Sequence, residues 1–219
     1  MTKKRVVITG VGTVNPLGLT VKDYADNLKR GISGISKIDH FDTNGYSTRI
    51  AGSVKNCDFT TWIDKKEARR LARFISFGYV AAAQAVQDSG LVIDPIADQV
   101  GVEIGSGIGG IEIFENMTLA LHQKGPSKVS PFTVPMMIVD MASGIVSIKI
   151  GAKGPNSCAV SACASSTHSI GNAFRMIQNG SAKAMVCGGS ESAISPLGIA
   201  SFCSATSLSL NNDNPKEAS

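Results

Sequence analysis

The sequence lacks the signatures of several common classes of protein. Its five cysteines are odd in number and form no Cys-x-x-Cys pair, so they predict neither a disulfide framework nor a zinc site. The formal net charge is only +4 over 219 residues and is spread along the chain, so the composition does not indicate a nucleic-acid partner. A reducing cytoplasm is therefore the expected location.

No hydrophobic run is long enough to cross a membrane. The most apolar stretch, residues 136–150, is interrupted by Asp140 and Lys149, whereas a membrane helix needs about 20 apolar residues. The N-terminus begins with basic residues, but the apolar run behind them ends at Gly10 and no cleavage site follows. We expect a soluble chain without a membrane partner.

The motifs for binding nucleotides are incomplete. Gly10 and Gly12 follow a β-branched run, but the third glycine of a dinucleotide fingerprint is replaced by Asn15. The glycine-rich segment 105–110 lacks the Lys and the Ser or Thr of a phosphate-binding loop. We expect neither a cofactor nor a metal.

What the sequence does contain is a pattern of strands and helices in alternation. The apolar fraction of 43% is sufficient for a buried core. Short β-branched or apolar runs predict strands, longer amphipathic segments predict helices, and their spacing suits a mostly parallel sheet of an α/β fold with right-handed crossovers. The strands are expected at 6–9, 100–104, 156–160 and 184–187, and the helices at 21–30, 74–89, 136–148 and from Ala164 through Ile177.

Cys163 lies where the third of these strands gives way to its helix. The first turn of a helix carries unpaired N–H groups and a partial positive charge, which favour a thiolate and could hold an oxyanion. Its neighbours are small, so a substrate carbonyl could approach closely. This arrangement predicts an acyl-accepting nucleophile. The alternative for a cysteine among alanines is a small buried hydrophobic residue, which we assign to Cys158, Cys187 and Cys203.

The sequence of residues 161–171, Ser-Ala-Cys-Ala-Ser-Ser-Thr-His-Ser-Ile-Gly, resembles the nucleophile motif of the β-ketoacyl-acyl carrier protein synthases. Among them it is most similar to the elongating type II enzymes. The resemblance extends through segments 5–12, 105–110, 130–137 and 188–191. It implies a thiolase-like fold, in which two α/β halves pack as five layers, αβαβα, with residues 1–219 as the N-terminal half. It also implies fatty acid chain elongation from acyl and malonyl thioesters.

The resemblance assigns roles to further residues. It implies that Ile108 gates the acyl tunnel, and that Gly198 and Phe202 line it. Phe132 would reach into the acyl pocket of a partner across a homodimer axis, although packing within its own chain is the alternative.

A basic segment is the expected docking surface for acyl carrier protein. By the same resemblance, this acidic partner would bind Lys65 and Arg69, with Lys128 as a more distant member. An ordinary solvated helix surface is the alternative interpretation.

The resemblance also requires two histidines that the sequence does not supply. They occur in the second half of such synthases, in motifs like Asn-Ala-His-Gly-Thr, and the only histidines here are His40, His122 and His168. His168 is about one helical turn beyond Cys163 and is expected to be structural. We therefore expect either a fragment of a condensing enzyme or a chain that acts with a separately supplied C-terminal half. The alternative function is a non-catalytic dimerising or assembly fragment.

Overall fold

The computed structural model describes residues 4–55 and 57–218, which form two compact units. The first, called the sheet unit below, comprises the described residues of segments 1–12, 59–110 and 130–192. The second unit comprises those of segments 13–58, 111–129 and 193–219. Each is described by itself.

A parallel sheet forms the centre of the sheet unit. Strand β3 (Val100–Gly105) lies between β4 (Asn156–Ser157) and β5 (Ala184–Gly189) and pairs in parallel with both. Every residue of β3 is buried, including Glu103, because the central strand of this parallel sheet is covered on both faces. The parallel α/β arrangement predicted from the sequence is present.

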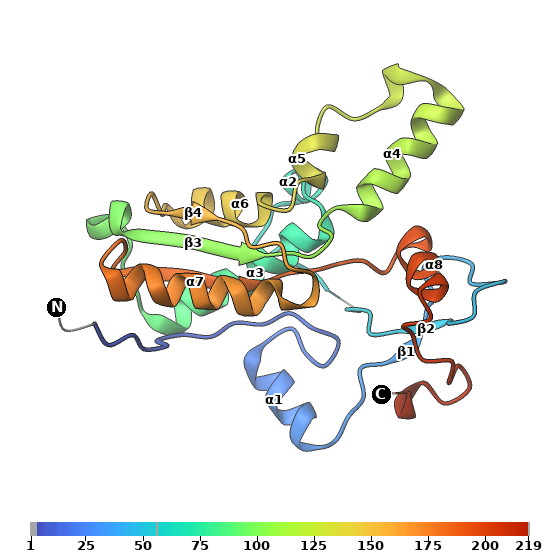
Figure 1. Ribbon diagram of the computed structural model, residues 1–219, viewed down its shortest axis with the longest axis horizontal. Helices are drawn as coiled ribbons and strands as arrows, with labels where there is room; N and C mark the ends of the chain where they lie inside the picture. Colours follow the sequence, from blue (N-terminus) through green and yellow to red (C-terminus); the bar gives the residue numbers. More distant parts are fainter. Residues whose placement is uncertain (1–3, 56, 219) are drawn as a thin grey trace. The chain divides into compact units, whose positions relative to one another are not determined.

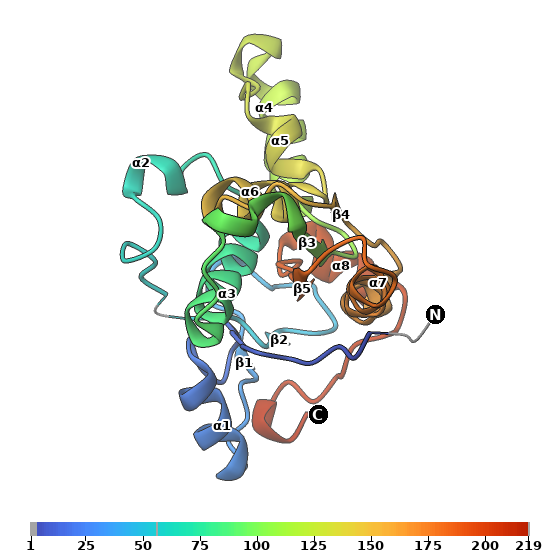
Figure 2. The ribbon, with the colours of Figure 1, turned by 90° about the vertical axis from the view of Figure 1, so that its left-hand side faces the viewer.

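Helices cover both faces of this sheet, giving three layers. Helices α3 (Arg73–Ser89) and α6 (Met141–Ile150) lie on one face and α7 (Ser165–Asn179) on the other (Figures 1 and 2). Helix α3 ends where the sequence predicts, because Gly90 adopts the left-handed conformation with φ of 64°. The shorter helical elements of the unit are α2 (Lys65–Ala68), η1 (Asp94–Gln99), α5 (Thr133–Met137) and η3 (Ala162–Ala164).

The expectation of a single helix over residues 136–148 is wrong. The chain forms α5, leaves the helical conformation at Ile138, and begins α6 only at Met141. The carbonyl of Met137 accepts a hydrogen bond from the backbone N–H of Gly110 at 3.2 Å. A carbonyl engaged by a distant loop favours the helix end at this point.

The strand expected at residues 6–9 is also absent from the described sheet. This segment makes no ladder pair, and Ile8 is 85% exposed. It lies instead against α3, where a Cβ added at Gly10 would come within 2.2 Å of the Ala85 carbonyl oxygen. The backbone N–H of Val11 donates to the Asp88 carboxylate at 2.9 Å. Gly10 thus serves a close approach to a helix.

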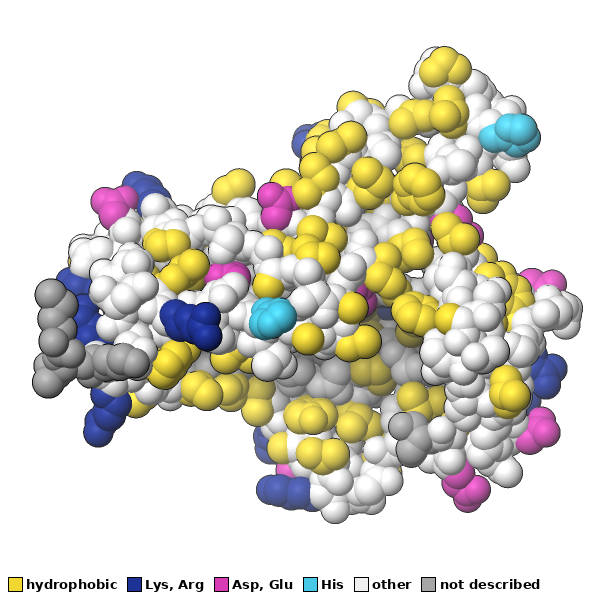
Figure 3. Space-filling view, viewed as in Figure 1, with side chains coloured by type: hydrophobic (Ala, Val, Ile, Leu, Met, Phe, Trp, Pro, Cys, Tyr) yellow, Lys and Arg dark blue, Asp and Glu magenta, His cyan; other side chains and the backbone are white. Residues whose placement is uncertain are grey.

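An apolar cavity of about 780 Å³ is lined by the N-terminal segment, β5, α3 and α7. Residues 170, 173, 174 and 177 have the sequence spacing of a helix with one buried face. In the structure Ala173 is buried, but Ile170 and Phe174 line the cavity and are about half exposed, so for these two the expectation is wrong. Hydrophobic side chains are visible along the strip between α7 and the N-terminal segment (Figure 3). Helix α7 is amphipathic as its sequence pattern indicates, but no layer of the described residues fully covers its apolar face.

The second unit contains mainly helices and loops. Helix α1 (Val21–Lys29) begins at the predicted N-cap Thr20, whose hydroxyl accepts from the N–H of Asp23. Strands β1 (Ser36–Lys37) and β2 (Ile50–Ala51) pair antiparallel within the irregular segment. Helix α4 (Ile111–Lys124) packs with α8 (Pro196–Ser204), and the 3₁₀ turns η2 (Pro126–Lys128) and η4 (Pro215–Glu217) complete the unit.

Over residues 4–55 and 57–218, none of the helices combines the length and apolar character needed to cross a bilayer. The same residues contain no group of three or more His, Cys, Asp or Glu side chains that could hold a metal ion.

Candidate active site

Cys163 is exposed on the 3₁₀ turn η3, which connects the segment after β4 to helix α7. The N-cap of α7 is Ala164, which has no side chain able to cap the helix. Within the turn, the N–H of Ala164 donates to the Ser161 carbonyl and the N–H of Ser165 donates to the Ala162 carbonyl. The peptide dipoles at the start of α7 still favour negative charge beside Cys163. The predicted position of this cysteine at a strand-to-helix junction is present in the structure.

The turn that carries Cys163 is strained and tied in place. Ala162 has φ of 52°, a left-handed conformation that is unfavourable for a residue with a Cβ. The hydroxyl of Ser165 donates to the Ala162 carbonyl at 2.7 Å and accepts from the Ser161 N–H at 3.0 Å. The sequence gives no signal for this strain, because alanine is not typical of left-handed positions.

Two glycines bring the turn onto the carboxyl ends of the sheet strands. Gly105 ends β3 and Gly189 ends β5, and the two are register partners. A Cβ at Gly105 would lie 2.5 Å from the Ser165 carbonyl oxygen, and one at Gly189 would lie 2.5 Å from the Ser166 Cβ. The start of α7 can therefore rest on the sheet only because both positions lack a side chain. The carboxyl ends of parallel strands are the usual place for a binding site.

Two of the three histidines make hydrogen bonds to other parts of the chain. His168 lies within α7, and its Nδ1 is 2.5 Å from the Ser161 hydroxyl, so it braces the turn as a structural residue. In the second unit, the His40 ring lies 2.9 Å from the Ile194 carbonyl oxygen, and His122 is in the last turn of α4.

The other cysteines differ from the uniform buried role expected for them. Burial raises the pKa of the Cys158 thiol above its ordinary value, which keeps it protonated and unreactive. Cys187 is exposed, which contradicts the expectation. At Cys203, partial burial opposes ionisation, but hydrogen bonds from Ser47 and Thr48 outweigh it and hold the pKa below its ordinary value. Cys203 is therefore the cysteine that could compete with Cys163 as a reactive thiol.

Ile108 lies on the glycine-rich loop between β3 and α4 and is 36% exposed. This loop approaches the nucleophile turn, since a Cβ at Gly107 would lie 3.3 Å from the Ala162 carbonyl oxygen. Ile108 and Cys163 thus belong to neighbouring loops at the same end of the sheet.

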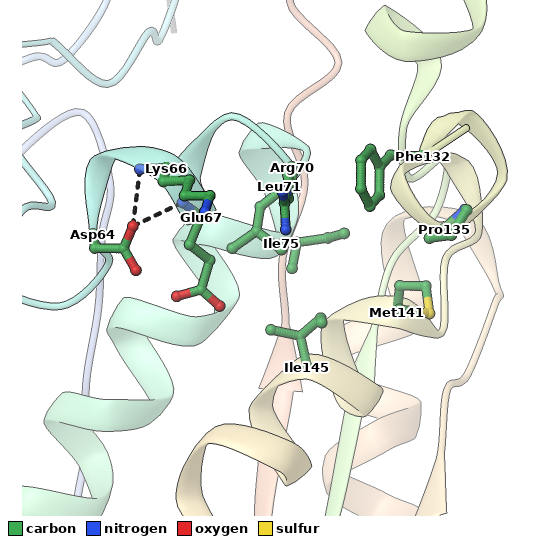
Figure 4. Close-up of a pocket in the computed structure, with 10 residues that line it drawn as sticks. All are labelled: Asp64, Lys66, Glu67, Arg70, Leu71, Ile75, Phe132, Pro135, Met141 and Ile145. Carbon is green, nitrogen blue, oxygen red and sulfur yellow. Dashed lines mark hydrogen bonds between the residues drawn. The ribbon is translucent and has the colours of Figure 1, made fainter. Parts of the chain in front are cut away.

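Phe132 is the N-cap residue of α5 and lines a cavity of about 510 Å³ in the sheet unit (Figure 4). Its ring lies 5.1 Å from the guanidinium carbon of Arg70, within the range of a cation–π contact. Phe132 is still 38% exposed, so packing within its own chain covers only part of the ring. In Figure 4 its ring faces the α2–α3 connection.

The basic residues expected to dock a carrier protein lie on separate elements. Lys65 is the first residue of α2 and Arg69 follows its end, and both are exposed. Helix α2 has only four residues, because the chain turns at Arg69 and is extended again at Ala72. Lys128 ends η2 in the second unit and is also exposed.

Gly198 and Phe202 lie on α8 of the second unit, one helical turn apart. Gly198 is buried, and a Cβ there would come within 2.1 Å of the Ala193 carbonyl oxygen. Phe202 is 39% exposed. Residues four apart share one face of a helix, so the face of α8 that contains Gly198 also carries the partly exposed ring of Phe202.

A family model for the N-terminal domain of β-ketoacyl synthases matches residues 3–219. The chain belongs to the β-ketoacyl synthase family. It is 51% identical over 218 residues to a protein from Synechocystis sp. named 3-oxoacyl-[acyl-carrier-protein] synthase 2, which covers 99% of this chain and 52% of that protein. A protein of the same name from Staphylococcus aureus is 52% identical over 211 residues, covering 96% of this chain and 51% of the relative.

Solved structures of β-ketoacyl synthases share the fold. A β-ketoacyl synthase from Burkholderia phymatum superposes with a TM-score of 0.85 at 28% identity, covering 97% of this chain and 53% of that one. A type II polyketide ketosynthase, solved in complex with its acyl-carrier protein, gives a TM-score of 0.82 at 26% identity, with 95% and 58% covered. The predicted family and its thiolase-like α/β fold are confirmed, and the chain spans about half the length of the curated relatives it matches.

Glu191 is the residue of this region that we did not single out from the sequence. Its carboxylate accepts hydrogen bonds from the loop that carries Ile108. The only signal was an acidic residue that ends the glycine-rich segment 188–191.

Proposed function

We propose that this chain carries the acyl-accepting part of a 3-oxoacyl-acyl carrier protein synthase of fatty acid elongation. The observation that supports this most directly is the exposed Cys163 on a strained turn, beside the uncapped start of α7. The names of relatives at about half sequence identity give the substrate class.

In the proposed first step the Cys163 thiolate attacks the carbonyl carbon of an acyl carrier thioester. The tetrahedral oxyanion is held by backbone N–H groups of the turn, and its collapse breaks the carbon–sulfur bond to the carrier. The carrier thiolate leaves and takes up the proton released when Cys163 ionised. The product is an acyl thioester on Cys163.

The second proposed step is decarboxylative condensation with a malonyl carrier thioester. Loss of CO₂ breaks the bond to the carboxyl group of the malonyl unit and leaves an enolate, whose carbon attacks the acyl carbonyl on Cys163. The carbon–sulfur bond to Cys163 then breaks, Cys163 leaves as a thiolate, and the 3-oxoacyl product remains on the carrier. Each donor to such a developing oxyanion contributes about 3 to 4 kcal/mol in studied enzymes. His168 is hydrogen-bonded to Ser161 and His40 to the Ile194 carbonyl, so we propose that a separate C-terminal half supplies the donors.

The remaining assignments form part of the same proposal. Ile108 gates the acyl pocket, Gly198 and Phe202 line it, and Phe132 contributes to the pocket of a second subunit in a homodimer. The partial exposure of Ile108, Phe132 and Phe202 supports this assignment, because each of these side chains has surface left to contact an acyl chain. Five free thiols suit a reducing cytoplasm as the site of the reaction.

Acyl carrier protein is the proposed macromolecular partner. Lys65 and Arg69 are exposed and would attract an acidic helix, which mainly accelerates encounter and sets orientation. Lys128 would extend this basic surface. The second candidate function is a non-catalytic assembly fragment, favoured by the uncovered apolar side chains along the cavity beside α7.

The deciding experiment is mass spectrometry of the chain after incubation with acyl carrier protein loaded with palmitate and, separately, with palmitoyl-CoA. We expect one acyl group, located on Cys163 by peptide mapping and lost in Cys163→Ala. Cys203→Ala is the matched control, since hydrogen bonds hold the pKa of the Cys203 thiol below its ordinary value, and it should be acylated at the wild-type rate. Acylation that persists in Cys163→Ala, or no acylation of the wild type, would refute the proposed function.

A further inference from the structure

The carboxylate of Glu191 accepts hydrogen bonds from a group of donors on the loop after β3, residues 106–109. Its Oε2 accepts from the backbone N–H groups of Gly107 and Ile108, each at 2.9 Å. Its Oε1 accepts from the N–H of Gly109 at 3.2 Å and from the Ser106 hydroxyl at 3.3 Å. Four donors from four consecutive residues therefore converge on one side chain that is more than 80 residues away in sequence.

The conformation of the loop explains why its donors converge. Gly109 has φ of 69°, and a left-handed residue after right-handed ones turns successive N–H groups toward one point, forming a nest for an anion. The Ser106 hydroxyl also accepts from the Gly109 N–H at 3.1 Å, which ties the two ends of the loop together. Charge-assisted hydrogen bonds of this kind are stronger than neutral ones.

The loop is held between Glu191 and the nucleophile turn. A Cβ at Gly107 would lie 3.1 Å from the Glu191 Oε2 and 3.3 Å from the Ala162 carbonyl oxygen. On one side the loop is anchored by charge, and on the other it touches the residue that precedes Cys163. A change in the position of Glu191 would therefore move Ile108 relative to the turn.

We propose that Glu191 is a positioning residue that sets where Ile108 stands relative to Cys163, and so sets the length of acyl chain that Cys163 accepts. This inference rests on the proposed function, because it assumes that Cys163 is acylated and that Ile108 bounds the acyl pocket. Glu191 itself contacts no substrate in this proposal. It acts by holding the loop in one conformation.

The test compares Glu191→Gln and Glu191→Ala with the wild type in acylation of Cys163 by octanoyl-CoA and palmitoyl-CoA. Freeing the loop should change the ratio of the two rates by at least about fivefold in Glu191→Ala, since small displacements near a reacting centre produce large rate effects. Glu191→Gln keeps one acceptor oxygen and should give a smaller change. The matched control is Glu112→Gln, which removes the same charge from an exposed residue in the first turn of α4.

Amide hydrogen exchange at Gly107, Ile108 and Gly109 gives a readout that does not depend on activity. We expect faster exchange at these amides in both Glu191 variants and no change in Glu112→Gln. If Glu191→Ala does not fold, Glu191→Gln decides the question. Suppose that a Glu191 variant folds, is acylated and shows faster amide exchange, but keeps the wild-type ratio of the octanoyl and palmitoyl rates. Glu191 would then be merely structural, and this inference alone would be overturned. No acylation of the wild type by either thioester would overturn the proposed function, and this inference with it.

Discussion

A methyl group added at Gly105 should displace the turn that carries Cys163. In Gly105→Ala the new Cβ would lie 2.5 Å from the Ser165 carbonyl oxygen and 2.7 Å from its carbonyl carbon. Ordinary contact begins at 3.4 Å, so the start of α7 and the end of β3 must separate by nearly 1 Å. The obstacle is backbone, which cannot move aside as the end of a flexible side chain can.

Two effects of different size follow from this displacement. Overpacking of this kind typically lowers the free energy of unfolding by about 1–3 kcal/mol. A misplacement of about 1 Å near a reacting centre can reduce the rate about 100-fold. We therefore expect Gly105→Ala to remain folded while its Cys163 is acylated at least about tenfold more slowly, the lower bound allowing for partial relaxation.

The assay measures the acylation rate of Cys163 by palmitoyl-CoA, together with urea denaturation of the same samples. Gly171→Ala is the matched control, because Gly171 lies in α7 and a Cβ there meets nothing within 4 Å. Removal of a helical glycine should raise the free energy of unfolding by about 0.5–1 kcal/mol and leave the acylation rate unchanged. Wild-type acylation in Gly105→Ala would refute the argument that the missing side chain at Gly105 places the nucleophile.

Three further predictions concern other contacts. The hydrogen bond and ion pair with Glu67, at 2.5 Å, hold the pKa of Lys149 above its ordinary value of 10.5 against a smaller opposing effect of burial. The stabilisation of the folded state by this ion pair should be complete below pH 10.5 and lost as the pH rises through the raised pKa of Lys149. The difference in urea midpoint between wild type and Lys149→Met should therefore shrink above pH 10.5. A difference that stays constant with pH would contradict the pairing. The Glu103 side chain is 1% exposed and its Oε1 accepts from the Asn172 amide at 2.7 Å. Asn172→Ala should lower the free energy of unfolding by about 1–3 kcal/mol in urea denaturation, and no loss would show that Glu103 needs no partner. Lys65→Glu with Arg69→Glu should slow acylation from acyl carrier protein more than acylation from palmitoyl-CoA, whereas the exposed pair Lys29→Glu with Lys37→Glu should affect neither. Equal slowing of both reactions would remove the docking role.

Local features of this chain could be read from its sequence because their causes are local. The cap at Thr20 and the helix end at Gly90 depend on the chemistry and conformation of single residues. The β-branched residues of segment 100–104 identified the strand β3, whereas its complete burial became known from the structure. The residues around Cys163 were sufficient to place it at the start of a helix and to indicate the family, which the comparisons confirm.

Periodicity identified apolar segments but not their neighbours. Residues 6–9 have the composition of a strand, yet they pair with no strand of the described sheet, and Ile170 and Phe174 face a cavity. Pattern shows which face of an element is apolar, whereas burial depends on what else packs there. The same limit applies to the break between α5 and α6, where the Met137 carbonyl is engaged by a loop from another part of the chain.

The sequence alone therefore indicated the family, placed Cys163 at a strand-to-helix junction and predicted strands β3, β4 and β5 in their order, because each depends on residues adjacent in the chain. Only the tertiary structure decided how the nucleophile is held: the glycine ends of β3 and β5 beneath α7, the left-handed Ala162, and the carboxylate of Glu191 within the loop of Ile108. Two of these contacts join residues far apart in the chain: Gly105 with Ser165, and Ile108 with Glu191. Such contacts depend on hydrogen-bond geometry and close packing between distant segments, which no local pattern of residue types encodes.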